Sequence, residues 1–231
     1  MITTGKIKFS PPLTILPLEN GDKLTRKEFE RRYQAMPHVK KAELIEGIVY
    51  MASPLRIKSH GEPHAYIITW LGNYIAVTPK IGLADNATVL LDADNEPQPD
   101  VLLRLEKDGQ SRINEDDYVE GTPELIVEIA ASTASYDLHE KLRVYRRNQV
   151  QEYLVWRVYD NEFDWFRLNS EGEYIKLEAN SQGIICSQFF PGLWLNKDAL
   201  LMGNLAEVLT TLQQGLASDE HQMFVKKLEG I

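Results

Sequence analysis

The sequence contains very little cysteine and has no long apolar run. Cys186 is the only cysteine among 231 residues, so the chain cannot form an intramolecular disulfide framework or a multi-cysteine zinc or iron–sulfur site. No apolar stretch approaches the ~18 residues that a membrane-spanning helix needs, and residues 1–10 lack the apolar core of a signal peptide. We therefore expect a soluble, cytoplasmic protein that does not enter a membrane.

Basic residues are scarce relative to acidic ones. Lys and Arg total 25, Asp and Glu total 34, and the formal net charge is −9. Because a net-acidic protein repels polyanions at long range, a function on nucleic acid would require a local basic surface or a bridging metal ion. The composition, with 43% apolar and 26% charged residues, is that of a globular protein and excludes collagen-like, low-complexity and wholly disordered chains.

No linker rich in proline, glycine or serine divides the chain, which predicts one principal domain. Prolines at positions 11, 12 and 17 favour an extended N-terminal lead-in over residues 1–24. Thr25 and Glu28 then form a capping box, with Glu28 reaching back to the start of a short helix. We expect the main domain over residues 25–196 and a C-terminal helical segment over 197–231.

The apolar pattern predicts interleaved helices and strands. We expect a hairpin over 42–51 that turns near Glu46 and Gly47, and a helix from His64 to Val77. Strands are expected over 87–91, 100–105, 125–130, 152–159 and 163–168, with a helix over 137–148, a further hairpin region over 172–177 and 184–190, an amphipathic helix over 198–213, and a helical or frayed tail. This order predicts a mixed α/β sheet flanked by helices.

Glu128 is the most informative residue, because it interrupts the apolar run from Leu125 to Ala130. A carboxylate inside a dry strand requires a cation or hydrogen-bond donors. Alternation along the strand places Ile126, Glu128 and Ala130 on one face. Two structural alternatives stay open, namely a strand-end glutamate that faces solvent and a salt bridge that only stabilises the fold.

Asp100 is the second candidate, since Pro99 fixes the backbone at the start of the predicted strand. An aspartate after proline is also common in plain turns. Together with Glu128 on a neighbouring strand, however, it would supply the hard oxygen ligands that Mg²⁺ or Mn²⁺ prefers.

Lys141 lies in the helix predicted after Glu128, on the same side as Asp137 and Tyr145. Its ammonium could reach over the sheet to Glu128 and there orient a nucleophile or stabilise charge on phosphate. The alternative is a lysine that pairs with Asp137 one turn away and has no catalytic role. Tyr145 is expected either as a packed aromatic or as a substrate contact.

His60 and His64 have the spacing of a helical metal pair, but Gly61 and Pro63 between them predict against a regular helical turn. We therefore expect His64 to cap the helix, donate a structural hydrogen bond or contact substrate.

These residues together resemble the restriction-endonuclease-like PD-(D/E)xK superfamily, and more narrowly its Uma-type endonuclease family, over about Thr25 to Leu195. The resemblance is carried by Pro99-Asp100, Glu128, Ser132-Thr133, Asp137, Lys141, Tyr145 and the segment 152–156, together with the segments 43–47 and 51–64. It implies a mixed sheet flanked by helices that carries one divalent-metal site. Ala130 stands where the motif has lysine, so the resemblance assigns that role to Lys141, as in members whose lysine has moved to the following helix.

The resemblance further implies an endonuclease that uses Mg²⁺ (or Mn²⁺) to hydrolyse nucleic acid, with DNA as the expected substrate. Asp100 and Glu128 would hold the metal, Glu46 would be a further ligand, and Lys141 would position the attacking water. One alternative is a catalytically degenerate binding or assembly module, and another is a hydrolase of different phosphate esters. The helix over 198–213 offers an interface for a homodimer, although the sequence leaves the oligomeric state open.

Overall fold

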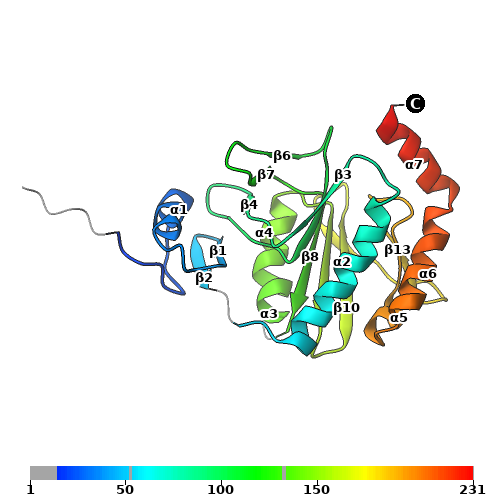
Figure 1. Cartoon of the computed structure of the whole chain (residues 1–231), viewed down its shortest axis with the longest axis horizontal. Helices are drawn as coiled ribbons and strands as arrows, with labels where there is room; N and C mark the ends of the chain where they lie inside the picture. The colour runs from blue at the N-terminus through cyan, green and yellow to red at the C-terminus, as the bar shows by residue number, and fades with distance from the viewer. Residues whose placement is uncertain (1–14, 52–53, 132–133, 231) are drawn as a thin grey trace, which may run out of the picture.

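A six-stranded mixed sheet forms the centre of the molecule (Figure 1). The computed structural model describes residues 15–51, 54–131 and 134–230. The strand order is β11-β10-β9-β8-β5-β3, in which β8 and β9 are parallel and all other neighbours antiparallel. These strands are β3 (Ile81–Asp85), β5 (Val101–Leu105), β8 (Leu125–Ala130), β9 (Glu152–Arg157), β10 (Glu162–Leu168) and β11 (Tyr174–Lys176). The predicted mixed α/β sheet is confirmed, although β3 was not among the predicted strands.

Helices cover both faces of this sheet, so its central strands are buried on both sides (Figure 1). The core on one face contains residues of α2 (Glu62–Ile75) and α6 (Leu205–Leu216), and that on the other contains residues of α4 (Leu142–Arg147). Leu125 and Val127 of β8 belong to the first core, and Ile126 and Ala130 to the second. The alternation predicted for this strand is confirmed, and it directs Glu128 toward the side of α4.

The register between β5 and β8 determines how the two predicted carboxylates meet. Val101 pairs with Val127, and both belong to the core beneath α2. Continuing this antiparallel register by one residue sets Asp100 opposite Glu128, on the other face.

The N-terminal part of the described chain has a small core of its own. Helix α1 (Arg26–Gln34) begins after Thr25, whose hydroxyl accepts a hydrogen bond from the Glu28 N–H at 3.4 Å. The other half of the predicted capping box is wrong, because the Glu28 carboxylate binds Arg31 and Arg32 instead of the helix start. Strands β1 (Ala42–Ile45) and β2 (Ile48–Met51) form the predicted hairpin.

The remaining elements are short. They comprise a sheet of β4 (Val89–Leu90), β6 (Ser111–Ile113) and β7 (Val119–Gly121), a ribbon of β12 (Ile184–Cys186) and β13 (Trp194–Asn196), the π-helical turns η1 (Ile57–Gly61) and η2 (Asp137–Lys141), and helices α3 (Ala134–Tyr136), α5 (Lys197–Leu201) and α7 (Asp219–Glu229). The hairpin predicted between 172–177 and 184–190 is wrong, since β11 pairs with β10 and β12 with β13.

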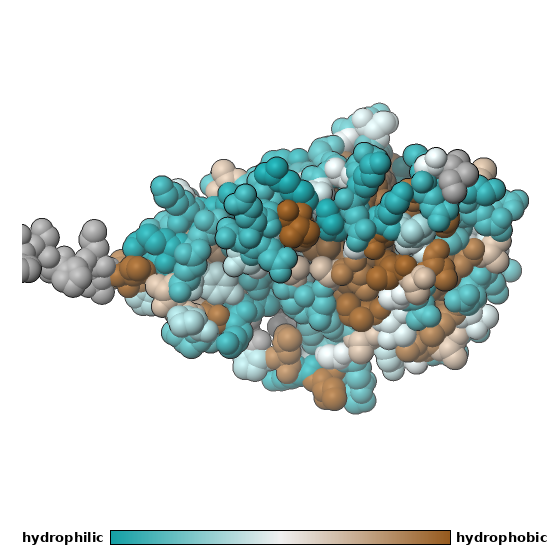
Figure 2. Space-filling view, turned by 45° about the horizontal axis from the view of Figure 1, so that its top comes forward, coloured by the Kyte–Doolittle hydropathy of each residue, from teal (hydrophilic) through white to brown (hydrophobic). Residues whose placement is uncertain are grey.

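The helix predicted over 198–213 is interrupted, because Gly203 adopts a φ of 72° between α5 and α6. Leu200, Val208 and Leu212 are buried in the core of the same chain. The apolar face of this segment therefore packs within the chain, and the homodimer stays a prediction. On the face in Figure 2, hydrophobic surface gathers toward the right of the view, while the left side, from which the N-terminal segment extends, is mainly hydrophilic. Among the described helices, none has the length and apolar character required to cross a bilayer.

Candidate active site

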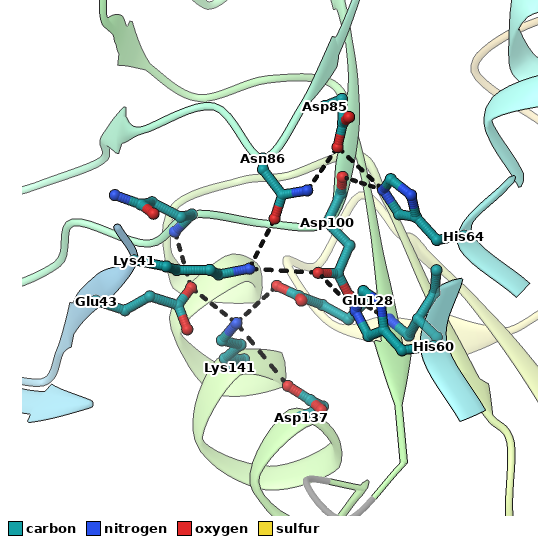
Figure 3. A network of polar contacts seen from close by, with 12 residues as sticks. Lys41, Glu43, His60, His64, Asp85, Asn86, Asp100, Glu128, Asp137 and Lys141 are labelled. Atoms are coloured by element: carbon teal, nitrogen blue, oxygen red, sulfur yellow. Dashed lines mark hydrogen bonds and ion pairs between the residues drawn. The ribbon is translucent and has the colours of Figure 1, made fainter. Parts of the chain in front are cut away.

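Asp100 and Glu128 line one cavity of about 730 Å³, at the edge where β8 ends and β5 begins. Lys41, Glu43, His60 and Lys141 line the same cavity (Figure 3). Asp100 is 4% exposed, and Glu128 and Lys141 are each 3% exposed, so the charged groups lie at its floor. The two carboxylates lie on the same side of the sheet, as a shared site requires.

Asp100 is held by groups from three parts of the chain. Its Oδ1 lies 3.2 Å from His60 Nε2 and 3.3 Å from Lys41 Nζ, and its Oδ2 accepts the Ile129 N–H at 2.8 Å. Burial raises the pKa of Asp100, but the His60, Lys41 and Ile129 contacts outweigh it and hold the pKa well below its usual range. Asp100 is therefore an ionised carboxylate at neutral pH.

Glu128 lies beside Asp100 but in a different electrostatic environment. Its Oε1 accepts hydrogen bonds from Lys141 Nζ at 2.8 Å and from Tyr145 Oη at 2.9 Å. Burial raises the pKa of Glu128 to about 8; the Lys141 ammonium opposes this shift, and the nearby Asp100 carboxylate adds to it. The two acids of the pair thus differ in proton affinity, in the pattern expected where two carboxylates share a site.

Lys141 reaches three carboxylates from η2, as the sequence predicted for Glu128. Its Nζ lies 2.8 Å from Glu128, 3.0 Å from Glu43 and 3.9 Å from Asp137 (Figure 3). Burial by itself lowers the pKa of Lys141, but the surrounding carboxylates, Glu128 foremost, raise it well above the ordinary value. Lys141 is consequently a fixed positive charge and cannot act as a general base at neutral pH.

The structure does not bring Glu46 to this cavity, which corrects the sequence assignment. Glu46 occupies the turn of the β1–β2 hairpin with a φ of 52°, and its exposed carboxylate pairs with Arg147 at 2.7 Å. The N-terminal acid of the site is Glu43, whose Oε1 accepts from Lys141 Nζ and from the Gln98 N–H at 2.8 Å. The glycine that follows, Gly47, was the sequence signal for a turn at Glu46, and in the structure Gly47 also has a positive φ.

His60 and His64 lie on one continuous helical segment, but the part that contains His60 is π-helical, which confirms the prediction against a regular helical turn. The π-helical turn η1 leads directly into α2, and the two rings stack with their centroids 5.7 Å apart. His64 Nε2 lies 3.0 Å from Asp85 Oδ1 and 3.1 Å from the Asp100 carbonyl oxygen. These contacts place His64 beside the Asp100 backbone, in the structural position that was one of its predicted alternatives.

Sequence reasoning missed Lys41, and it left the position of Tyr145 open. Lys41 Nζ donates to Asn86 Oδ1 at 3.0 Å while it contacts Asp100, and no sequence motif distinguished it from Lys40. Tyr145 is fully buried behind Glu128 and, among the described residues, is not part of the cavity lining. The motif residues Ser132 and Thr133 lie outside the described residues.

The donor set fits a magnesium-type ion held by two carboxylates. Within the described part of the chain, no three His, Cys, Asp or Glu residues are grouped as a metal cage. Mg²⁺, however, commonly binds through one or two carboxylates and completes its shell with water and substrate phosphate. The hydrogen bonds that Lys141 and Tyr145 donate to Glu128 both end at Oε1, so Oε2 would be the oxygen available to such an ion.

Comparisons with known proteins agree with this architecture. The model of the Uma2 family, described as "Putative restriction endonuclease", matches residues 26–198. No curated protein matches the chain significantly. Among solved structures, a "putative nuclease belonging to DUF820" from Anabaena variabilis is similar with a TM-score of 0.56 and 10% identity, over 75% of this chain and 97% of that one. At that identity the similarity shows a shared fold only.

Proposed function

The chain belongs to the Uma2 family of restriction-endonuclease-like proteins, and on that premise we propose that it hydrolyses phosphodiester bonds of nucleic acid with Mg²⁺ or Mn²⁺. One observation carries the proposal. Two carboxylates from neighbouring strands, Asp100 and Glu128, line a single cavity together with a lysine that contacts one of them at 2.8 Å.

Asp100 and Glu128 would hold the metal ion. When bound, such an ion polarises the scissile phosphate and lowers the pKa of the attacking water. It would also offset the long-range repulsion between a chain of net charge −9 and a polyanion. Glu46 is not retained as a ligand, because it lies in the exposed hairpin turn.

Lys141 would stabilise the negative charge that develops on the phosphate. Its ammonium stays protonated, is buried, and is held by Glu128 and Glu43, so it needs no reorganisation during the reaction. Glu43 accepts a hydrogen bond from Lys141 and would act by positioning its ammonium. His60 and the Ile129 N–H orient Asp100 in the same way.

Cleavage assays on plasmid DNA and on single-stranded DNA and RNA, with Mg²⁺ or Mn²⁺, test this function. We expect cleavage by the wild type and a loss of at least about 100-fold in Asp100→Asn and Glu128→Gln. Glu115→Gln, which changes an exposed acid in the β6–β7 turn, is the matched control. Full activity of Asp100→Asn and Glu128→Gln would refute the proposed site.

A second candidate is a degenerate module that keeps the fold and binds without cleaving. The observation in its favour is that Lys141, Lys41 and His60 already contact the carboxylates of the site. Isothermal calorimetry with Mg²⁺ and Mn²⁺ separates the candidates. Absence of binding at millimolar metal, together with absence of cleavage, would support the module.

A further inference from the structure

The cavity is small compared with a nucleic-acid duplex. Its volume of about 730 Å³ corresponds to a sphere roughly 11 Å across, in the size range of small-ligand pockets. The major groove of B-DNA alone is about 12 Å wide, so an intact duplex is too broad to enter. Asp100 and Glu128 at the floor are only 4% and 3% exposed. A phosphate must therefore approach them on a strand that can bend into the cavity.

The rim of the cavity carries an exposed aromatic ring. Tyr159 is 61% exposed and follows β9, at the edge where the parallel strand β8 also ends. The Val158 N–H donates to the Ala130 carbonyl oxygen at 2.9 Å. Because Ala130 is two residues beyond Glu128 in β8, this hydrogen bond holds the backbone next to Tyr159 close to the end of β8 that carries Glu128. An exposed tyrosine at the mouth of a cavity offers a flat face on which a base of any sequence can stack.

The wall of the cavity is also aromatic and contains an unsatisfied polar atom. Tyr50 and Tyr136 line it in mutual contact, with ring centroids 4.3 Å apart. Tyr136 Oη is buried and has no hydrogen-bond partner in the described part of the structure. The two rings give the cavity an aromatic wall near the carboxylates, against which a base can pack.

Cations accompany these rings. Arg56, which is exposed, and Lys41, which is partly exposed, line the cavity in addition to the buried Lys141. A site that combines aromatic faces with basic groups along a path to the carboxylates matches the requirements of a single strand, whose bases stack and whose phosphates pair with cations. It does not match groove recognition of a duplex, which uses an inserted helix or ribbon.

We propose that the cavity takes an unpaired nucleotide of a single strand, with a base stacked on Tyr159 and the neighbouring phosphate directed toward Asp100 and Glu128. The proposal deepens the proposed function by naming its substrate class. It rests on that function only for the hydrolysis of the phosphodiester bond, and not for the binding of the strand. Single-stranded DNA and RNA share this chemistry, so the test includes both.

Binding is measured by fluorescence anisotropy of the full-length chain with labelled single strands of DNA and RNA and with the matching duplexes. Ca²⁺ replaces Mg²⁺, because it accepts the same oxygen ligands in a flexible geometry. We expect at least one of the two single strands to bind about tenfold or more tightly than its duplex. Tyr159→Ala should weaken that binding roughly 5- to 100-fold, the range given by loss of one base–aromatic stack, whereas Tyr159→Phe should retain it.

Tyr118→Ala provides the matched control, since Tyr118 is an exposed tyrosine outside the cavity lining. Equal affinity for single strand and duplex, or equal effects of Tyr159→Ala and Tyr118→Ala, would overturn the proposal. Cleavage in Mg²⁺ is scored separately. If a single strand binds in a Tyr159-dependent way but is not cleaved, this inference stands and hydrolysis is refuted. If duplex and single strand are cleaved with equal efficiency, hydrolysis stands and this inference is refuted.

Discussion

The Lys141 ammonium lies 2.8 Å from the Glu128 carboxylate, although 13 residues separate the two in the chain. The superfamily motif that the sequence resembles has its lysine two residues after the acid, where this chain has Ala130. Ala130 is fully buried in the core that also contains Val144 and Tyr145, so the strand position is filled by packing. The π-helical turn η2, which leads into α4 on the same face, places the Lys141 ammonium beside Glu128 instead.

Replacing Lys141 should therefore affect both catalysis and folding. Lys141→Met keeps the apolar stem but leaves Glu128 and Glu43 without their shared cation, and breaking a buried ion pair costs about 3–5 kcal/mol. We expect the free energy of unfolding in urea to fall by that order and cleavage to fall by at least about 100-fold.

The double variant Glu128→Gln/Lys141→Met separates the two effects. It replaces both members of the contact, so no acid is left buried opposite a missing ammonium at position 128; its unfolding free energy should exceed that of Lys141→Met alone, while cleavage stays lost. A Lys141→Met protein with wild-type cleavage rates would contradict the catalytic role of the ammonium.

Glu43 and Glu46 give a direct test of which N-terminal acid serves the site. Glu43→Gln should reduce cleavage about tenfold, because the amide oxygen can still accept from Gln98 but no longer balances the Lys141 charge. Glu46→Gln loses only a partly exposed pair with Arg147, so it should leave cleavage unchanged and cost no more than about 1 kcal/mol of stability. The reverse ranking in parallel rate measurements would reinstate Glu46.

The comparison of these two glutamates shows what the sequence could predict and why the rest was missed. Glu128 was recognisable because a carboxylate inside an apolar strand is costly, and Lys141 because helical spacing set it above that strand. The assignment of Glu46 failed although the sequence placed it in the hairpin turn, because the resemblance called for an N-terminal acid and the hairpin register that brings Glu43 to Lys141 is not a local signal. Lys41 carried no local signal, and His60 was noticed only for its spacing to His64, because their contacts with Asp100 span 59 and 40 residues.

The same distinction between local and long-range information holds for the fold. β8 was predicted to the residue, because its apolar run is continuous and bounded. β3 was missed, since Gly82 and Ala84 weaken the apolar pattern of a strand that is stabilised by pairing with β5. The partners of β11 and β12 depend on the sheet order, which alternation within each segment does not encode.

Asp100 should control metal affinity. Asp100→Asn removes the carboxylate that is ionised at neutral pH, so calorimetric titration with Mg²⁺ or Mn²⁺ should show a dissociation constant raised by at least about tenfold. Asp116→Asn, in the exposed β6–β7 turn, should titrate like the wild type. Unchanged metal binding in Asp100→Asn would place the ion elsewhere in the chain.

Glu96 should make the stability of the fold depend on pH. Its Oε2 is buried and unpartnered among the described residues, while its backbone pairs with Leu44 of β1. Burial raises the pKa of Glu96 to about 8, and the Glu30 carboxylate adds to the shift. Because the folded state holds a proton that the unfolded state releases above an ordinary glutamate pKa, this contribution is complete below about pH 4.5 and is lost as the pH rises toward 8. The loss amounts to at most ~5 kcal/mol. Urea unfolding at pH 5, 6.5 and 8 measures this. The free energy of unfolding should fall more steeply with rising pH in the wild type than in Glu96→Gln, whose amide does not titrate, and Glu115→Gln should follow the wild type. If the free energy of unfolding changes equally with pH in the wild type and in Glu96→Gln, Glu96 is ionised in the folded protein throughout this range.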